Sequence, residues 1–377
     1  MSAPGFIPVC EPLLAGRESE YVNQCLTTGW ISSAGAFLER FEDGMARLCA
    51  VAHGVACANG TAALHLACAA LGLGPGDEVI APAFSIVSTA NAIGQTGATP
   101  VLVDVEPDTL CLDPRQAAAA LTPASKAIMP VHMYGHPAEM DAILELARAH
   151  GLKVIEDAAQ VHGASYHGRP LGGLGDMGCF SFFANKLITT GEGGMVVTDD
   201  EHLAQRLRLL RNLAHGAKRF EHHELGFNYR LTNIQAALGL AQLERLEAIK
   251  LKKAAIGERY NQNLGDLPEL TLYWGRHRAG CEPVMWMYGL LLPPDRDRDQ
   301  FMADLKVLGV DSRAFFLPLN QQPLYDGSHP GLPDLRGSFP VSEEAGRRGL
   351  YLPSGLSLTD EQIDRASQAV RRLLGRA

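Results

Sequence analysis

The sequence predicts an α/β fold: a mainly parallel, partly mixed β-sheet flanked by helices, followed by a smaller C-terminal α+β domain. Short apolar segments alternate with amphipathic ones over about 200 residues, as in layered α/β proteins. Several of the short segments are apolar at successive positions, which is typical of strands covered on both faces. From about residue 232 the alternation stops, which indicates a second unit.

The apolar segments and the amphipathic ones between them define the large domain. The strands are expected at residues 53–60, 78–84, 99–105, 126–135, 153–158, 179–185 and 193–200. The helices are expected at 61–72, 85–96, 113–121 and 137–150. The last helix carries apolar residues at helical spacing in "MDAILELARAH" and ends before Gly151, which suits a helix stop.

The remaining part of the chain is more helical and richer in short elements. Residues 232–264 predict one long helix, and "MWMYGLLL", "FMADLKVLGV" and a final helix from residue 359 follow. We expect a large domain at residues 1–245, including an N-terminal arm, and a smaller α+β domain at 246–377.

Composition limits the classes of function. The chain has 377 residues, of which 46% are hydrophobic and 20% charged, so it can build a sizeable core. Its net charge of -9 argues against a general role on nucleic acids or membrane surfaces, since both need a basic face. The net charge does not exclude a local basic pocket for a phosphorylated ligand.

Cysteines and the N-terminus indicate the compartment. The eight cysteines form no CxxC pair and are irregularly spaced, so we expect reduced core residues and no metal site. The first residues lack a basic stretch followed by an apolar core, and no apolar run approaches the roughly 20 residues of a membrane span. We expect a soluble, cytoplasmic protein.

Three features point to chemistry, and the first is "ANGTAALHLACAALGLG". A strand is expected to end at Asn59 and Gly60, and a helix to begin at Thr61. Free N–H groups and the helix dipole make such a terminus an anion site, to which Thr61 adds a hydroxyl. The alternative is an ordinary capped helix start.

The second feature is "VIEDAAQVHG", in which Glu156 and Asp157 end an apolar strand. Carboxyl ends of strands face the ligand crevice in open α/β sheets, so a carboxylate there can hold a buried cation. Asp157 either serves a ligand in this way or caps the next helix.

The third feature is "FSFFANKLITTGEGG", in which Lys186 follows an apolar strand. A lysine in a partly dry site loses part of its preference for charge, its pKa falls, and it becomes nucleophilic. The alternative is a lysine that extends to solvent. Gly191, Gly193 and Gly194 favour the first interpretation, because they allow close backbone approach or positive φ beside the lysine.

A formal dinucleotide fingerprint occurs in "GGLGDMG", with Gly173, Gly175 and Gly178 in the required spacing. The fingerprint should follow a strand and open a helix. Here it follows polar "YHGRP" and leads into a strand, so we reject a dehydrogenase.

A phosphate cradle, a carboxylate and a lysine at strand ends have one joint explanation. Pyridoxal phosphate needs a helix N-terminus for its phosphate, an anion for its ring nitrogen and a lysine for its aldehyde. The sequence therefore predicts a pyridoxal 5′-phosphate enzyme with Lys186 and Asp157 as its catalytic residues.

Three segments make a family resemblance recognisable: "EDAAQVHGA", "FSFFANKLITTGEGGMVVTDD" and "GFNYRLTNIQAALGLAQLERL". They resemble the DegT/DnrJ/EryC1/StrS sugar aminotransferases, which have the fold-type I aminotransferase architecture. The resemblance extends from "TTGWISSAGAFLERFE" to "LYLPSGLSLTDEQID". "TTGWISS", "MPVHMYG" and "VMWMY" are most similar to members that aminate C4 of GDP-4-keto-6-deoxymannose.

The resemblance implies roles for individual residues. Lys186 would attach covalently to the cofactor, and Asp157 would pair with the pyridinium nitrogen. Expected cofactor contacts are Gln160 at the 3′-oxygen, Gly60, Thr61 and Ser181 at the phosphate, and Asn228 at the phosphate of the neighbouring subunit. Substrate contacts are expected from Trp30, His132, Tyr134, Glu192, Arg230 and Phe316. The role of Asn228 implies a homodimer with composite active sites. His162 either touches cofactor or substrate or lies on a helix surface.

Two positions depart from the family pattern. Members usually place an aromatic ring over the cofactor where this chain has Ile86, so either Ile86 covers the ring or Phe84 does. Asn320 in "FFLPLNQQPLY" stands where a histidine is common, which weakens any statement about the sugar and nucleotide.

The implied reaction moves an amino group from L-glutamate to the 4-keto carbon of a nucleotide-linked 4-keto-6-deoxy sugar. The alternative acceptor is a dTDP-linked keto sugar or a keto-cyclitol. Family dehydratases usually carry a histidine in place of the lysine, so Lys186 argues against that activity. A non-catalytic cofactor-binding regulator usually carries a DNA-binding module, for which the N-terminus is too short and the net charge unsuitable.

Overall fold

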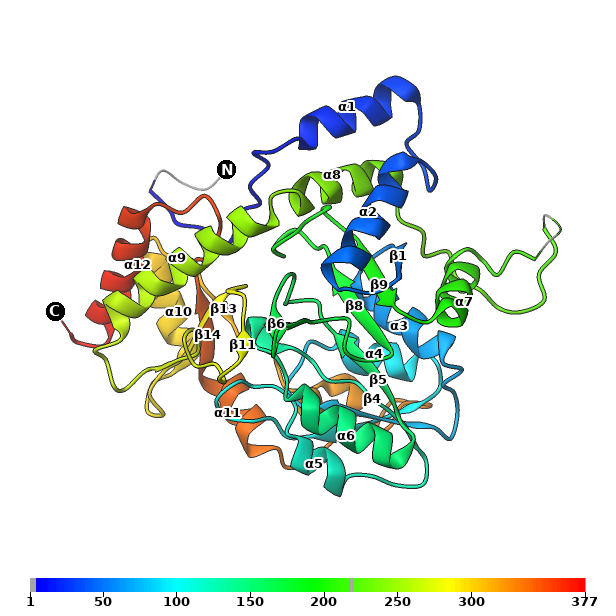
Figure 1. The fold of residues 1–377 in the computed structure, drawn as a ribbon. Coiled ribbons are helices and arrows are strands. Elements are labelled where there is room, and N and C mark those ends of the chain that lie inside the picture. Colours follow the sequence, from blue (N-terminus) through cyan, green and yellow to red (C-terminus); the bar gives the residue numbers. More distant parts are fainter. Residues whose placement is uncertain (1–4, 217, 219, 377) are drawn as a thin grey trace.

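The computed structural model describes residues 5–216, 218 and 220–376 (Figure 1). Its largest sheet has seven strands in the order β1-β9-β8-β5-β4-β2-β3. Only β9 runs antiparallel to its neighbours, β1 and β8. These strands are β1 (His53–Cys57), β2 (Glu78–Pro82), β3 (Thr99–Val103), β4 (Ser125–Ile128), β5 (Lys153–Asp157), β8 (Met177–Ser181) and β9 (Gly194–Thr198). The predicted α/β class with a mainly parallel sheet is confirmed.

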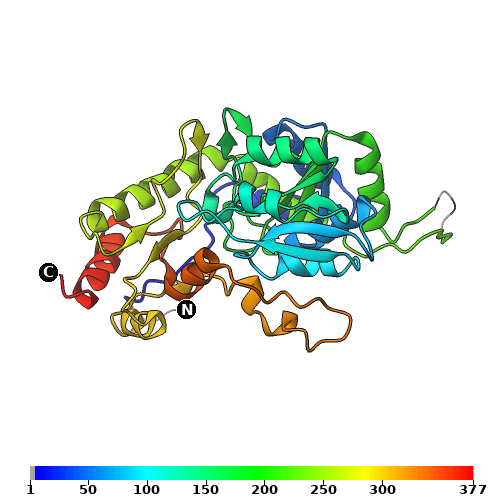
Figure 2. The same ribbon diagram turned by 90° about the horizontal axis from the view of Figure 1, so that it is seen from below.

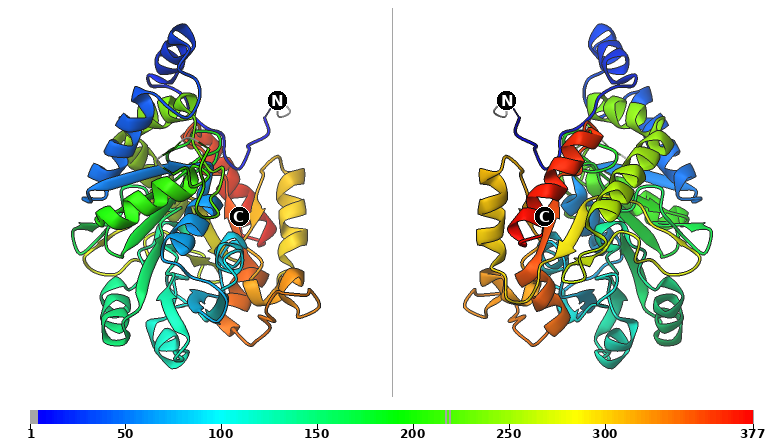
Figure 3. Two further views of the ribbon diagram at one scale, coloured as in Figure 1. Left: turned by 90° about the vertical axis from the view of Figure 1, so that its right-hand side faces the viewer. Right: turned by 90° about the vertical axis from the view of Figure 1, so that its left-hand side faces the viewer.

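Helices cover both faces of this sheet (Figure 3). One apolar cluster joins α2, α6 and α8 to the sheet, and a second joins α3, α4 and α7. Successive residues of a strand alternate between them: Val154 belongs to the first cluster and Ile155 to the second. The helices of this part are α1 (Glu18–Thr28), α2 (Ala36–Leu48), α3 (Gly60–Ala70), α4 (Ser88–Gly94), α5 (Pro114–Ala119), α6 (Met140–His150), α7 (Glu201–Arg211) and α8 (Asn233–Leu243).

The C-terminal part has its own antiparallel sheet, in the order β10-β12-β14-β13, and lies beside the large sheet (Figure 2). Its elements are α9 (Leu246–Leu264), β10 (Thr271–Leu272), β12 (Tyr288–Leu291), α10 (Arg298–Val307), β13 (Arg313–Ala314), η2 (Leu319–Gln321), η3 (Pro323–Tyr325), α11 (Pro340–Arg348), β14 (Gly349–Leu352) and α12 (Asp360–Leu373). A domain boundary after residue 245 remains our proposal.

The single helix expected at residues 232–264 is wrong. The chain forms α8 and α9 instead, with Glu244 and Arg245 between them. Thr232 caps α8 in a capping box with Gln235. The two helices pack on different partners, α8 on α1 and α2 and α9 on α12, so the chain changes direction where the partners change.

Several short elements escaped the sequence pattern. The strand expected at 126–135 ends at Ile128, and a 3-10 turn, η1 (Met133–Gly135), follows with positive φ at Tyr134 and Gly135. A small sheet joins β6 (Ser165–Tyr166), β7 (Arg169–Pro170) and β11 (Cys281–Glu282). Within the described residues, no helix combines the length and apolarity needed to cross a membrane.

Candidate active site

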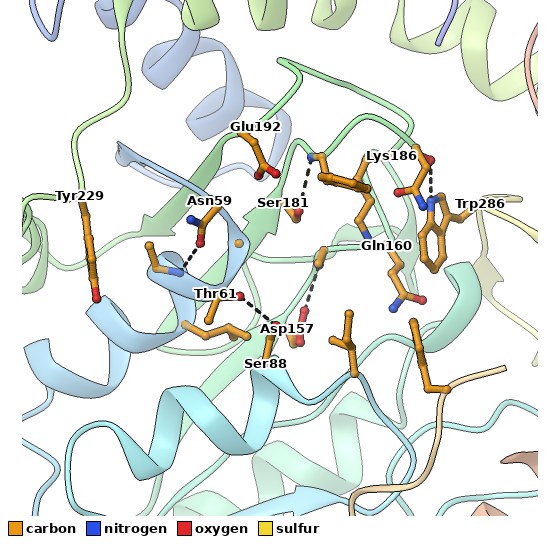
Figure 4. Close-up of a pocket in the computed structure, with 18 of the residues that line it drawn as sticks. Asn59, Thr61, Ser88, Asp157, Gln160, Ser181, Lys186, Glu192, Tyr229 and Trp286 are labelled. Atoms are coloured by element: carbon orange, nitrogen blue, oxygen red, sulfur yellow. Dashed lines mark hydrogen bonds between the residues drawn. The ribbon is translucent and has the colours of Figure 1, made fainter. Parts of the chain in front are cut away.

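A cavity of about 650 Å³ opens beyond the carboxyl ends of β5 and β8 (Figure 4). Strand ends, the starts of α3 and α4, and three segments of the C-terminal part, at Trp286, Phe316 and Tyr351, contribute to its lining. The expected site residues that line it are Gly60, Thr61, Ile86, Asp157, Gln160, Ser181, Lys186, Glu192 and Phe316. The fold therefore brings the candidate phosphate cradle, the carboxylate and the lysine together around one cavity.

Lys186 lies in a loop and not directly at a strand end. The strand expected to reach residue 185 stops at Ser181, and the Lys186 N–H donates to the Phe183 carbonyl at 2.9 Å. The amine lines the cavity and lies 3.8 Å from the centroid of the Trp286 ring. Burial lowers the pKa of Lys186 to about 7, although the charge of Asp157 opposes this shift. The glycine pattern is also explained, because Gly191 has a φ of +80°.

Asp157 ends β5 and faces the same cavity while being only 3% exposed. Its carboxylate accepts from the Ala159 N–H at 3.2 Å and from the Thr89 hydroxyl at 3.5 Å. Residues 158–164, which directly follow Asp157, form turns and no helix, so its carboxylate caps a turn and not a helix. Burial raises the pKa of Asp157 above its usual value, while Ala159 and the charge of Lys186 act in the opposite direction. Among the described residues, no lysine, arginine or histidine forms an ion pair with this carboxylate.

The start of α3 forms the candidate anion site. Asn59 is the N-cap and accepts from the Ala62 N–H at 2.8 Å, and the Thr61 hydroxyl donates to the Ser88 hydroxyl at 2.8 Å. A Cβ at position 60 would lie 2.7 Å from the Ser181 Cβ, so only glycine lets α3 approach β8 this closely. The N–H groups of Gly60 and Thr61 have no partner within the described structure.

Gln160 is oriented by the backbone of η1. Its Oε1 accepts from the Tyr134 N–H at 2.6 Å, and its side chain points into the cavity (Figure 4). Tyr134 itself is 3% exposed and does not line the cavity. Its ring packs against Phe316 and Trp286, at centroid distances of 5.7 and 5.9 Å, so Tyr134 supports two residues of the cavity wall. A direct substrate contact by Tyr134 stays a prediction.

His132 is fully buried and is not among the residues that line the cavity, so its expected substrate contact stays a prediction. Its Nδ1 accepts from the Ala138 N–H at 3.0 Å, so its Nε2 carries a proton and donates to Glu156, also at 3.0 Å. The N–H groups of Gly172, Leu174 and Gly175 donate to the same carboxylate. The glycine-rich stretch that mimicked a dinucleotide motif thus surrounds a glutamate of its own chain.

We expect Glu156→Ala to lower the free energy of unfolding by about 3–5 kcal/mol, since it strands several buried donors. Burial works against the charge of Glu156, but its donors outweigh this and hold the pKa of the carboxyl below its usual value. Denaturant unfolding is the measurement. The control is Glu201→Ala, whose side chain is 60% exposed and pairs with His53; a change within about 1 kcal/mol is expected there. Equal effects of the two variants would contradict the assignment.

Three further expected residues lie outside the cavity of their own chain. Trp30 is exposed on the loop after α1, and Asn228 is exposed next to Arg230. Arg230 donates to Asn228 at 2.7 Å and to Asn212 at 3.0 Å, and it lines a separate hollow of about 430 Å³. Contact of these residues with the site of a partner subunit stays a prediction.

The structure shows the surroundings of three other residues that the sequence singled out, Ile86, His162 and Asn320. Ile86 is 44% exposed and lines the cavity, whereas Phe84 is buried against Tyr134. His162 lies neither in the cavity nor on a helix surface; it is buried against Phe180 and Phe182, and this burial lowers its pKa to about 3. Asn320 is held by the Gly337 carbonyl and Glu343.

The cavity also contains residues to which the sequence assigned no role. They include Asn59, Ser88, Tyr229 and Trp286. Trp286 stood inside the quoted segment "VMWMY", but nothing local indicates that a residue of the C-terminal part reaches Lys186. Tyr229 follows the predicted Asn228 and approaches His65 Nδ1 through its hydroxyl at 3.1 Å.

The large mixed sheet, the C-terminal part with its own small sheet, and the cavity that contains Lys186 and Asp157 together define an aminotransferase of fold-type I. The chain belongs to the DegT/DnrJ/EryC1/StrS aminotransferase family, which matches residues 12–371. It is 46% identical over 377 residues to GDP-perosamine synthase of Caulobacter vibrioides, covering 98% of both chains. The same-named protein of Escherichia coli O157:H7 is 40% identical over 359 residues, covering 95% of this chain and 96% of that one. A crystal structure of DesI with its TDP-sugar product matches with a TM-score of 0.90 and 33% identity, covering 99% of this chain and 94% of that one.

Proposed function

We propose that this aminotransferase uses pyridoxal 5′-phosphate to move an amino group from L-glutamate to C4 of a GDP-linked 4-keto-6-deoxy sugar. The observation that carries the proposal is that Lys186, Asp157 and the open start of α3 line one cavity. The GDP-perosamine synthases, similar to this chain over nearly its whole length, support the choice of sugar class.

The residues present fit this cofactor. The unpartnered N–H groups at the start of α3, with Thr61 and Ser181, suit a phosphate. Asp157 is a buried carboxylate, which a positively charged partner would stabilise, and the protonated ring nitrogen of the cofactor would be such a partner. The amide nitrogen of Gln160 would be the group that donates to the ring oxygen, since its Oε1 already accepts from the Tyr134 N–H. Ile86 supplies an apolar surface at the cavity wall.

Bound pyridoxal phosphate supplies an electron sink for the charge left when a proton leaves the carbon next to the amino group. Lys186 would hold the aldehyde of the cofactor, and its amine, once displaced by glutamate, would act as the base that takes the α-proton and the acid that returns it. Hydrolysis by water would then release 2-oxoglutarate. Asp157 would hold a proton on the ring nitrogen. The keto sugar is aminated by the same residues in the reverse order. The presence of Lys186 in the cavity argues against a dehydratase.

The second candidate acceptor is a dTDP-linked keto sugar, because the similar structure of DesI was determined in the presence of its TDP-sugar product. A keto-cyclitol is the other alternative. We expect kcat/KM for a GDP-linked 4-keto-6-deoxy sugar to exceed that for its dTDP counterpart at least about tenfold, because a site that hydrogen-bonds one base leaves groups unpaired with the other. Parallel assays with both sugars and glutamate, with the amino sugar quantified by mass spectrometry, measure this. A preference for the dTDP sugar would move the chain to the second candidate.

We further propose that two chains form a homodimer with composite sites. Trp30, Asn228 and Arg230 support it, because these polar and aromatic side chains stand outside the cavity of their own chain. Sedimentation should give the mass of two 40.5 kDa chains. In mixtures of Lys186→Ala and Asn228→Ala chains, mixed dimers should regain one intact site and hence activity. A monomeric, active protein would contradict the proposal.

A further inference from the structure

The indole ring of Trp286 forms one wall of the cavity, and the amine of Lys186 lies over its face (Figure 4). The Nζ atom is 3.8 Å from the ring centroid. Cations within about 6 Å of a tryptophan face are attracted by the negative potential of the ring, and the attraction is stronger where water is excluded. Trp286 is 2% exposed, so little water competes for this face.

The ring is held from several sides. Its Nε1–H donates to the Asn185 carbonyl at 2.8 Å, directly before Lys186 in the chain. Its backbone carbonyl accepts from the buried ammonium of Lys253 at 2.8 Å, and Lys253 also donates to the Ser354 carbonyl at 2.6 Å. The Tyr134 ring stacks near it with an interplanar angle of 18°. Trp286 is therefore fixed relative to the loop that carries Lys186, before any ligand is present.

We propose that the face of Trp286 is the docking place of the Lys186 amine whenever that amine is not attached to the cofactor. This inference rests on the proposed function. A lysine released by the amino acid has four flexible carbons and could leave the reacting carbon; the ring keeps it inside the cavity. The ring also stabilises the ammonium that forms when Lys186 has taken a proton, while Asp157 contributes the opposite charge.

Other titratable groups surround the lysine and must be considered in any pH measurement. They are Asp157, Glu192, Tyr229 and Tyr351 on the cavity wall, His162 behind β8, and Lys253 beneath Trp286. None of them changes when only the electron density of the indole ring is altered. Fluorination of tryptophan does this, since each added fluorine weakens the negative potential of the ring face with little change in shape.

The test uses protein loaded with pyridoxamine phosphate, the amine form of the cofactor, which leaves Lys186 free. Trace acetic anhydride labels uncharged amines, and mass spectrometry of the Lys186 peptide over a pH series gives the pKa of this lysine. Labelling should rise near pH 7, because burial lowers the pKa of Lys186 to about 7; an ordinary lysine titrates near 10.4. The indole ring favours the charged form of the Lys186 amine. The pKa of Lys186 should therefore fall with each fluorine on the ring, by up to about one unit in total.

A matched control separates Trp286 from the other two of the three tryptophans, Trp30 and Trp274. In a Trp286→Phe protein carrying the same fluorotryptophans, the labelling curve should not depend on fluorine number. In single-turnover reactions with glutamate, Trp286→Leu should slow proton transfer about tenfold at unchanged half-saturation, and Trp286→Phe should recover part of the rate. If the pKa of Lys186 measured by labelling does not change with fluorination in the protein that retains Trp286, the proposal is overturned.

The same experiment detects failure of the proposed function separately. In protein loaded with the aldehyde form, Lys186 should resist labelling in every variant, since its amine is occupied. Equal labelling of Lys186 in the aldehyde and amine forms would refute the proposed attachment itself. Protection of Lys186 combined with an unchanged pKa would refute only the docking role of Trp286.

Discussion

Lys186→Ala should reduce transamination at least about 1,000-fold, because in the proposed mechanism this one residue both holds the cofactor and moves the proton. General acid–base groups alone contribute roughly 100- to 10,000-fold to enzymatic rates. The measurement is kcat with glutamate and a 4-keto sugar, in protein saturated with cofactor. Loss of a buried amine from the cavity should leave the fold intact, which circular dichroism checks.

The matched control for this variant is Lys252→Ala, an exposed lysine on α9. It should keep the wild-type rate. Small primary amines added to the Lys186→Ala protein should restore part of the proton transfer, since they can enter the 650 Å³ cavity. A Lys186→Ala protein with wild-type turnover would remove the lysine from the mechanism.

Asp157→Asn should lower kcat at least about 100-fold, or about 2.7 kcal/mol in activation free energy. The amide has nearly the same shape and retains an oxygen that can accept from the Ala159 N–H, but it carries no charge to hold a proton on the ring nitrogen. The effect should appear in both half-reactions with glutamate and with the keto sugar. Stopped-flow absorbance of each half-reaction is the measurement.

Asp157→Asn should lower the rate but should not lower the free energy of unfolding. Burial raises the pKa of Asp157 in the fold, so the folded protein binds this proton more tightly than the unfolded chain does. Its contribution to stability is therefore lost as pH rises through the folded pKa, and the cofactor-free Asp157→Asn protein should be at least as stable at neutral pH. Asp141→Asn, at an exposed ion pair with Arg169, is the control and should change neither rate nor stability appreciably. Normal kcat in Asp157→Asn would contradict the role of the carboxylate.

Much of the site was predictable because it depends on local patterns. Apolar runs locate the buried strands, and parallel strands place Asp157 and the segment before Lys186 at one edge of the sheet. The start of α3 follows from the turn at Asn59 and Gly60. These signals need no knowledge of distant contacts.

The remaining features depend on tertiary packing. Asp157 is the last residue of its strand, whereas His132 lies beyond the end of β4, and its ring is held by the buried carboxylate of Glu156. The break between α8 and α9 has no glycine or proline, and it follows from the different partners of the two helices. Trp286 reaches Lys186 only because the C-terminal part docks on the large sheet, which local periodicity does not encode.

The central claim is that Lys186 is covalently attached to pyridoxal phosphate in the resting protein. Borohydride reduction of the cofactor-loaded protein, followed by proteolysis and mass spectrometry, tests it most directly. The account predicts the phosphopyridoxyl label on the peptide containing "ANKLITTGEGG", at Lys186. A label on any other lysine, such as the buried Lys253, would contradict it.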